Sequence, residues 1–145
     1  MTSPRPTYED AELILRLYEM RREPRLRQGR AWFVSSFKVK NLAEFAEVCP
    51  PGSDQHASYR MVTTYWEMVA SFVTSGVLNE ELFFQSGREL LLVYERMQGI
   101  LPLLREQHGD STSLGNLEAV ARRFVDWWER HSPGAPAAFA KRIRG

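Results

Sequence analysis

The stretch Tyr59–Gly76, YRMVTTYWEMVASFVTSG, decides how this chain folds. Its apolar residues recur with the period of an α-helix and cover about half of the circumference at ~100° per residue. The rest of the surface carries mainly hydroxyl-bearing residues and alanine, namely Thr63, Thr64, Ala70, Ser71 and Thr74. Two residues are charged, Arg60 and Glu67. A solvated helix face normally carries long charged side chains, so the stretch predicts a central helix that protein encloses on nearly every side.

Capping signals divide the chain before and after this helix. Thr7 and Asp10 have the spacing of a capping box, and Asn41 precedes Glu44 at the same spacing. Pro24 kinks the first helix or begins a second one in its first turn. Further helix starts are predicted at Ser53 or Asp54, at Asn79 and within Ser86–Glu89.

These patterns predict an all-α fold, because no segment has a persuasive strand pattern. We expect a compact irregular bundle of five to seven helices around a central buried helix at about Ser58–Gly76. Asp110–Asn116 is rich in Ser, Thr, Gly and Asp and is predicted to be a loop. Residues 1–131 are expected to form a single helical domain. Residues 132–145 are expected to be a Pro/Ala linker and a short basic tail, helical or frayed.

Composition fits one soluble domain. The chain has 145 residues, of which 43% are hydrophobic and 26% charged, and this is enough to bury a sizeable core. The net charge of +1 creates no overall attraction to nucleic acid or to an anionic membrane. A single cysteine, Cys49, excludes an internal disulfide. Neither a signal peptide nor a membrane-spanning apolar run is evident, so we expect a cytoplasmic protein without a membrane partner.

The sequence assembles no catalytic, metal-binding or cofactor-binding set. Its three histidines, His56, His108 and His131, have no partner at the i, i+4 spacing that places two ligands on one helix face. The Glu-x-x-His pairs of di-metal helical bundles are missing as well. An enzyme stays possible, but no reaction can be named, and we favour a non-catalytic protein.

Glu67 is the one acidic residue that stands out. It lies on the hydroxyl-rich face with Arg60, so if that face is covered its carboxylate must be paired. The favoured interpretation is a buried polar contact to an arginine of a neighbouring helix. The alternative is a small-ligand pocket that holds Glu67 and Arg60 among Tyr65 and Trp66.

A second candidate surface is the arginine-rich segment Arg16–Arg30. Residues 1–40 hold nine Lys/Arg and five Asp/Glu, whereas residues 41–110 hold four and ten. The simplest account is that the arginines pack against the acidic middle of the chain or of a partner subunit. The alternative is a nucleic-acid-associated or regulatory factor whose arginines contact phosphates. The candidate contact residues are Arg21, Arg22, Arg25, Arg27 and Arg30.

Aromatic residues favour self-association. Trp127 and Trp128 are adjacent, so their side chains are ~100° apart and Trp127 falls at the edge of the apolar face of its helix. Trp127 could cover the C-terminal tail or lie in an oligomer contact. Together with the poor solvated face of the central helix, this predicts an interaction or scaffold protein that forms a homodimer.

Three segments together resemble a known group of proteins: Tyr18–Pro24 (YEMRREP), Ala31–Phe33 (AWF) and Tyr65–Met68 (YWEM). They resemble small, uncharacterised, all-helical bacterial proteins that are grouped as domains of unknown function. The resemblance covers most of Tyr8–His131 and implies a helical fold and a bacterial, cytosolic origin. It implies no activity and no functional residues.

Overall fold

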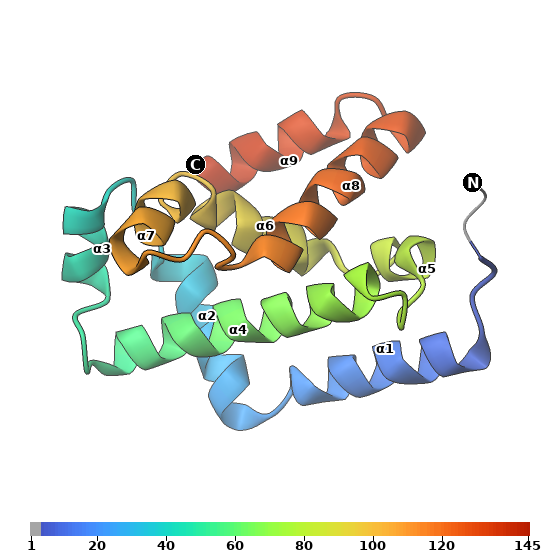
Figure 1. The fold of residues 1–145 in the computed structure, drawn as a ribbon, viewed down its shortest axis with the longest axis horizontal. Coiled ribbons are helices and arrows are strands. Elements are labelled where there is room, and N and C mark those ends of the chain that lie inside the picture. The colour runs from blue at the N-terminus through green and yellow to red at the C-terminus, as the bar shows by residue number, and fades with distance from the viewer. Residues whose placement is uncertain (1–3) are drawn as a thin grey trace.

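The computed structural model describes residues 4–145, and these residues form nine α-helices (Figure 1). The helices are α1 (Tyr8–Met20), α2 (Pro24–Ser36), α3 (Leu42–Val48), α4 (Asp54–Thr74), α5 (Glu80–Phe84), α6 (Arg88–Met97), α7 (Leu101–His108), α8 (Gly115–His131) and α9 (Ala135–Arg144). The predicted all-α fold is confirmed, but the expected count of five to seven helices is too low. The additional elements are α7, which has Pro102 in its first turn, and α9, which lies in the segment expected to be a linker and tail.

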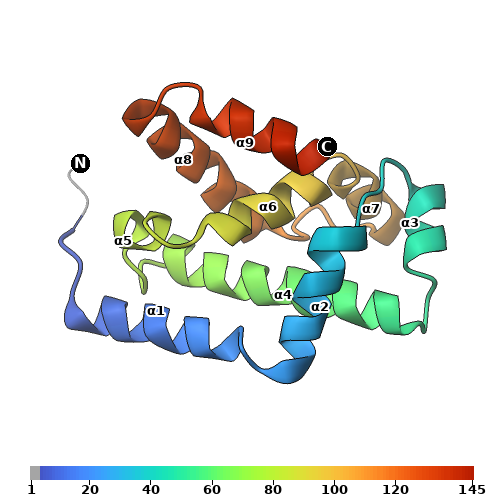
Figure 2. The same ribbon diagram turned by 180° about the vertical axis from the view of Figure 1, so that it is seen from behind.

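The predicted central helix is α4, which crosses the middle of the molecule (Figures 1 and 2). It packs most extensively against α2 on one side and α8 on another. Gly29 of α2 faces α4, and a Cβ there would make ordinary van der Waals contacts of 3.6 Å with Ser58 and Val62. Thr63 and Ala70 are buried as expected, whereas Arg60 and Thr64 remain exposed.

Most helix starts follow the predicted capping signals. Thr7 and Asp10 form a reciprocal capping box, with Asp10 N–H donating to Thr7 Oγ1 over 3.2 Å and Thr7 N–H donating to Asp10 Oδ2 over 2.7 Å. Asn41 and Asn79 cap α3 and α5 through their side-chain oxygens. The predicted capping box within Ser86–Glu89 differs: α6 does begin there, but its N-cap is Gly87 and lacks a side-chain hydrogen bond.

A single hydrophobic core joins α2, α4, α6 and α8. Its largest fully buried side chains include Trp66, Phe33, Phe37 and Phe124. The segment after residue 131 continues as α9, which packs along α6 and α8. Trp128, rather than Trp127, meets this helix, with its ring 5.6 Å from that of Phe139. The division of the chain into a domain and a tail at residue 131 stays a prediction.

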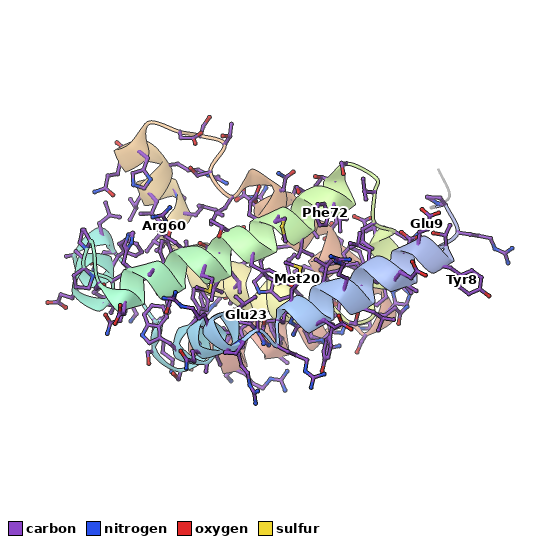
Figure 3. The ribbon with its side chains drawn as sticks, turned by 90° about the horizontal axis from the view of Figure 1, so that it is seen from below. Tyr8, Glu9, Met20, Glu23, Arg60 and Phe72 are labelled. Atoms are coloured by element: carbon purple, nitrogen blue, oxygen red, sulfur yellow. The ribbon has the colours of Figure 1, made fainter. Side chains whose placement is uncertain are left out.

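Helix α1 lies at the edge of the molecule and runs antiparallel to α4 (Figures 1 and 3). Two of its 13 residues are buried, Asp10 and Leu17. Asp10 Oδ1 accepts a hydrogen bond of 2.8 Å from the backbone N–H of Asn79, so the same carboxylate caps α1 and ties it to the start of α5. α1 therefore keeps a broad outer surface free for contacts.

Candidate functional site

The outer surface of α1 carries an apolar stripe that the other residues of the range 4–145 leave exposed. Its members are Tyr8, Ala11, Leu15 and Tyr18, all exposed and spaced three, four and three residues apart. The exposed fractions are 91% for Tyr8, 63% for Leu15 and 55% for Tyr18. Tyr8 projects away from the molecule at the N-terminal end of the helix (Figure 3). We call these four residues the α1 stripe.

Beside this stripe lies an apolar pocket of about 360 Å³, which we call the Trp66 pocket. Residues of α1, α4 and the α5–α6 junction line it: Ile14, Leu15, Leu17, Tyr18, Arg21, Tyr65, Trp66, Val69, Phe83, Ser86 and Gly87. The helices that border it, α1, α4 and α5–α6, are seen from behind in Figure 2. The pocket thus combines segments that are distant in sequence, and Tyr65 and Trp66 are the two members that the sequence predicted.

Arg21 is the charged member of the Trp66 pocket. Its guanidinium carbon lies 5.2 Å from the ring centre of Trp66 and 5.4 Å from that of Tyr18, which are cation–π distances. The side chain is 18% exposed. Its Nε–H is buried and has no acceptor among residues 4–145, and the same is true of Trp66 Nε1.

The nearest carboxylate to Arg21 is committed to another arginine. Glu89 of α6 accepts hydrogen bonds of 2.7 Å from Nε and 2.8 Å from a terminal nitrogen of Arg30 on α2. This bidentate pair raises the pKa of Arg30. Arg21 reaches Glu89 only at 3.8 Å, which is an ion pair without a hydrogen bond.

Tyr65 fixes one wall of the pocket. Its hydroxyl donates a hydrogen bond of 2.5 Å to the carbonyl oxygen of Leu17, near the end of α1. Burial raises the pKa of Tyr65 to about 12, so the hydroxyl stays protonated and able to donate at neutral pH.

At the α5–α6 junction, Gly87 is required by close packing. A Cβ at this position would lie 2.4 Å from the Cζ of Phe83, whose ring forms part of the pocket wall. A larger residue at position 87 would therefore require the Phe83 ring to move.

Glu67 does not join Tyr65 and Trp66 in the pocket. It accepts hydrogen bonds from Leu117 N–H over 2.8 Å and from Asn116 Nδ2 over 2.7 Å. Asn116 and Leu117 lie in the first turn of α8, whose N-cap residue offers no side-chain hydrogen bond of its own. The polar contact expected of Glu67 is present, but its partner is a helix N-terminus and not an arginine.

Arg60 is likewise separate from the Trp66 pocket. It is exposed and borders another cavity of about 400 Å³, together with Tyr59, His56 and His108. Of the four residues that the sequence grouped in one pocket, Tyr65 and Trp66 therefore line the Trp66 pocket. Glu67 and Arg60 lie on other surfaces.

The predicted contact arginines fall into two groups. Arg21 and Arg30 meet Glu89, in agreement with pairing to the acidic middle of the chain. Arg22, Arg25 and Arg27 are exposed, and no ion pair joins them to a carboxylate of the described residues. Their contact with a partner or with phosphate stays a prediction.

Trp127 is half-buried in an aromatic cluster of its own chain. Its ring lies 5.5 Å from Phe84, 6.0 Å from Phe124 and 4.5 Å from His131. At the edge of the apolar face, Trp127 therefore packs against residues of its own chain. A role for Trp127 between subunits stays a prediction.

Two absences hold for the part of the chain that the structure describes. Residues 4–145 contain no group of three or more His, Cys, Asp or Glu side chains placed to hold a metal ion. None of the helices formed by these residues has the length and apolar character needed to cross a bilayer.

The fold and these surfaces define an all-α helical bundle with an apolar pocket beside a peripheral first helix. The chain belongs to the family described as Domain of unknown function (DUF4760), whose match covers residues 6–124. This agrees with the resemblance seen in the sequence. Comparisons with curated proteins and with solved structures gave no match.

Proposed function

We propose that this protein is a non-catalytic interaction protein that self-associates as a homodimer through the α1 stripe. The observation that carries the proposal is the exposure of Tyr8, Leu15 and Tyr18 along one side of α1. Spacings of three and four residues are those of a coiled-coil seam, in which each apolar side chain packs between those of a second helix. The family match brings no activity that would favour another function.

Charge along α1 suits an antiparallel pair of such helices. Glu9 and Glu12 lie exposed in its N-terminal half, whereas Arg16 and Glu19 lie exposed in its C-terminal half. A two-fold axis across the stripe places the acidic N-terminal half of one helix opposite Arg16 of the other. The helix dipoles also oppose each other in this arrangement.

We further propose a bacterial cytoplasm as the setting. Cys49 is a free and fully buried thiol, and burial raises its pKa to about 11. A protonated, buried thiol of this kind has a structural and not a reactive role, and it suits a reducing compartment.

Sedimentation equilibrium of the full chain at tens of micromolar tests the dimer. We expect a mass of two chains for the native protein. Leu15→Glu should raise the dissociation constant by about 100-fold or more, because the two-fold axis removes a buried leucine twice. Val77→Glu is the matched control, since Val77 is 62% exposed and lies outside α1. A native protein that is monomeric at these concentrations would refute the proposal.

A further inference from the structure

The Trp66 pocket holds a positive charge that the described residues, 4–145, satisfy only through a distant ion pair. Arg21 is the charged residue in its wall, and its buried Nε–H has no acceptor among residues 4–145. A guanidinium that is largely removed from water is normally paired and hydrogen-bonded. The cation–π contacts of Arg21 with Trp66 and Tyr18 leave its Nε–H without an acceptor in this range, because an aromatic ring does not replace a hydrogen-bond acceptor in the guanidinium plane.

The charges around Arg21 do not balance. Arg21 and Arg30 share one carboxylate, that of Glu89, and both oxygens of Glu89 already accept hydrogen bonds from Arg30. One positive charge is therefore left at the pocket. An anion bound here would pair with the uncompensated guanidinium of Arg21. Arginine is the residue type best suited to hold a carboxylate with two hydrogen bonds.

Other unused donors lie along the same pocket. Gly87 in the wall is the N-cap of the ten-residue helix α6 and offers no side-chain hydrogen bond, although Glu89 already places a carboxylate in the first turn of this helix. Trp66, which is 1% exposed and forms part of the wall, has a buried Nε1–H without an acceptor within the described chain. The remaining wall is apolar, mainly Ile14, Leu17, Val69 and Phe83.

We propose that the Trp66 pocket binds a small carboxylate that carries an apolar chain. The carboxylate pairs with Arg21, and the chain lies against the apolar wall. The volume of about 360 Å³ is at the lower end of the range for small-molecule pockets and fits a medium-chain acid. This function is additional to self-association and does not depend on it.

Octanoate is the test ligand, titrated by calorimetry into the full chain at neutral pH. We expect saturable 1:1 binding, and 1-octanol, which lacks the charge, should bind at least about tenfold more weakly. Affinity should rise by about fourfold per methylene from hexanoate to octanoate, because each buried methylene contributes ~0.8 kcal/mol. In ¹⁵N spectra the indole resonance of Trp66, assigned with Trp66→Phe, should shift on binding.

Two pairs of variants separate the pocket from general effects. Arg21→Gln should weaken octanoate binding by about tenfold or more, whereas Arg22→Gln, an exposed neighbour outside the pocket, should leave it unchanged. Ser86→Trp should block the rim, whereas Gln85→Trp should not, since both residues are exposed and only Ser86 lines the pocket. Circular dichroism confirms that each variant is folded.

Three results would overturn the proposal: no binding of octanoate at millimolar concentration, equal affinity for octanoate and octanol, or unchanged affinity in a folded Arg21→Gln variant. The dimer test uses Leu15 and sedimentation, so either proposal can fail while the other stands.

Discussion

The carboxylate of Glu67 on α4 lies 2.8 Å from the backbone nitrogen of Leu117 and thereby caps a helix that begins almost fifty residues later in the chain. The start of α8 has Leu114 in the left-handed region, with φ of 53°, and no side-chain cap of its own. Glu67 supplies the missing acceptor from outside. The Nδ2 of Asn116 donates to Glu67 over 2.7 Å, while its Oδ1 accepts from Thr74 over 2.7 Å, so the contact extends along α4.

Removing this external cap should destabilise the fold. We expect Glu67→Ala to lower the free energy of unfolding by about 1–3 kcal/mol, because two amides in the first turn of α8 lose a charged acceptor. Urea denaturation measures the effect. Glu106→Ala is the control, since Glu106 is exposed on α7 and its carboxylate makes no hydrogen bond within residues 4–145, so its loss should change stability by less than about 0.5 kcal/mol. Equal losses in the two variants would contradict this role of Glu67.

Asp10 should make stability depend on pH in the acid range. Hydrogen bonds from the backbone of Thr7, and then from that of Asn79, lower the pKa of Asp10 in the folded state. A lowered pKa stabilises the fold fully above the unfolded value of about 3.9, and the contribution is lost as the pH falls through the folded value. Asp10→Asn should therefore unfold more easily than the native protein at pH 7.

The difference between Asp10→Asn and the native protein should shrink as the pH falls below about 4. Thermal melts followed by circular dichroism at several pH values measure it. Asp126→Asn, on the exposed side of α8, is the comparison variant and should follow the native profile. A difference between Asp10→Asn and the native protein that stays constant down to pH 3 would argue against this account.

Arg30 and Glu89 should be coupled energetically. Their bidentate contact joins α2 to the first turn of α6, and both side chains are about four-fifths buried. In a double-mutant cycle with Arg30→Gln and Glu89→Gln we expect a coupling energy of about 1–3 kcal/mol. The pair Arg123–Glu80 is more exposed and should give at most about 1 kcal/mol. A cycle in which the two pairs give the same small value would show that burial adds nothing to the Arg30–Glu89 contact.

Gly87→Ala should cost stability because of crowding. The new Cβ would fall within 2.4 Å of the Phe83 ring, and moving that ring disturbs the core beside α5, at a cost of about 1–3 kcal/mol. Gly99→Ala offers a fair comparison, since nothing lies within 4 Å of its Cβ position. Chemical denaturation of both variants decides the point, and a neutral Gly87→Ala would mean that the ring moves freely.

Local rules predicted the parts of the fold that depend on neighbouring residues. The capping box of Thr7 and Asp10 and the Asn41 cap need only residues three positions apart, so their spacing reveals them. The enclosed character of α4 was also visible, because it is a property of one continuous helix surface. Helix number was harder to predict, because α7 and α9 are short and each carries a proline in its first turn, which marks a turn or a linker as readily as a helix start.

The Trp66 pocket could be predicted only in part from the sequence. Trp66 and Glu67 are neighbours in the chain but point ~100° apart on a helix, so they belong to different surfaces. The charged residue beside Trp66 is Arg21, which α1 brings close through a contact 45 residues distant in sequence. Single-sequence patterns give the direction of a side chain but not the helix that it faces, and for this reason Arg21 was named as a contact residue of a different surface and not as the charged partner of Trp66.

The small number of contacts that hold α1 determines where the fold unfolds locally. Leu17 and Asp10 are its buried side chains, and the Tyr65 hydroxyl and the Asn79 amide hold it from the neighbouring helices. Such an element can detach at a lower free energy than global unfolding requires, so its amide protons should exchange with solvent before those of α4. A partner that binds over Leu15 and Tyr18 favours the attached state of α1 by mass action and so slows the exchange of its amide protons. The exchange rate of α1 then measures how much of this surface is bound.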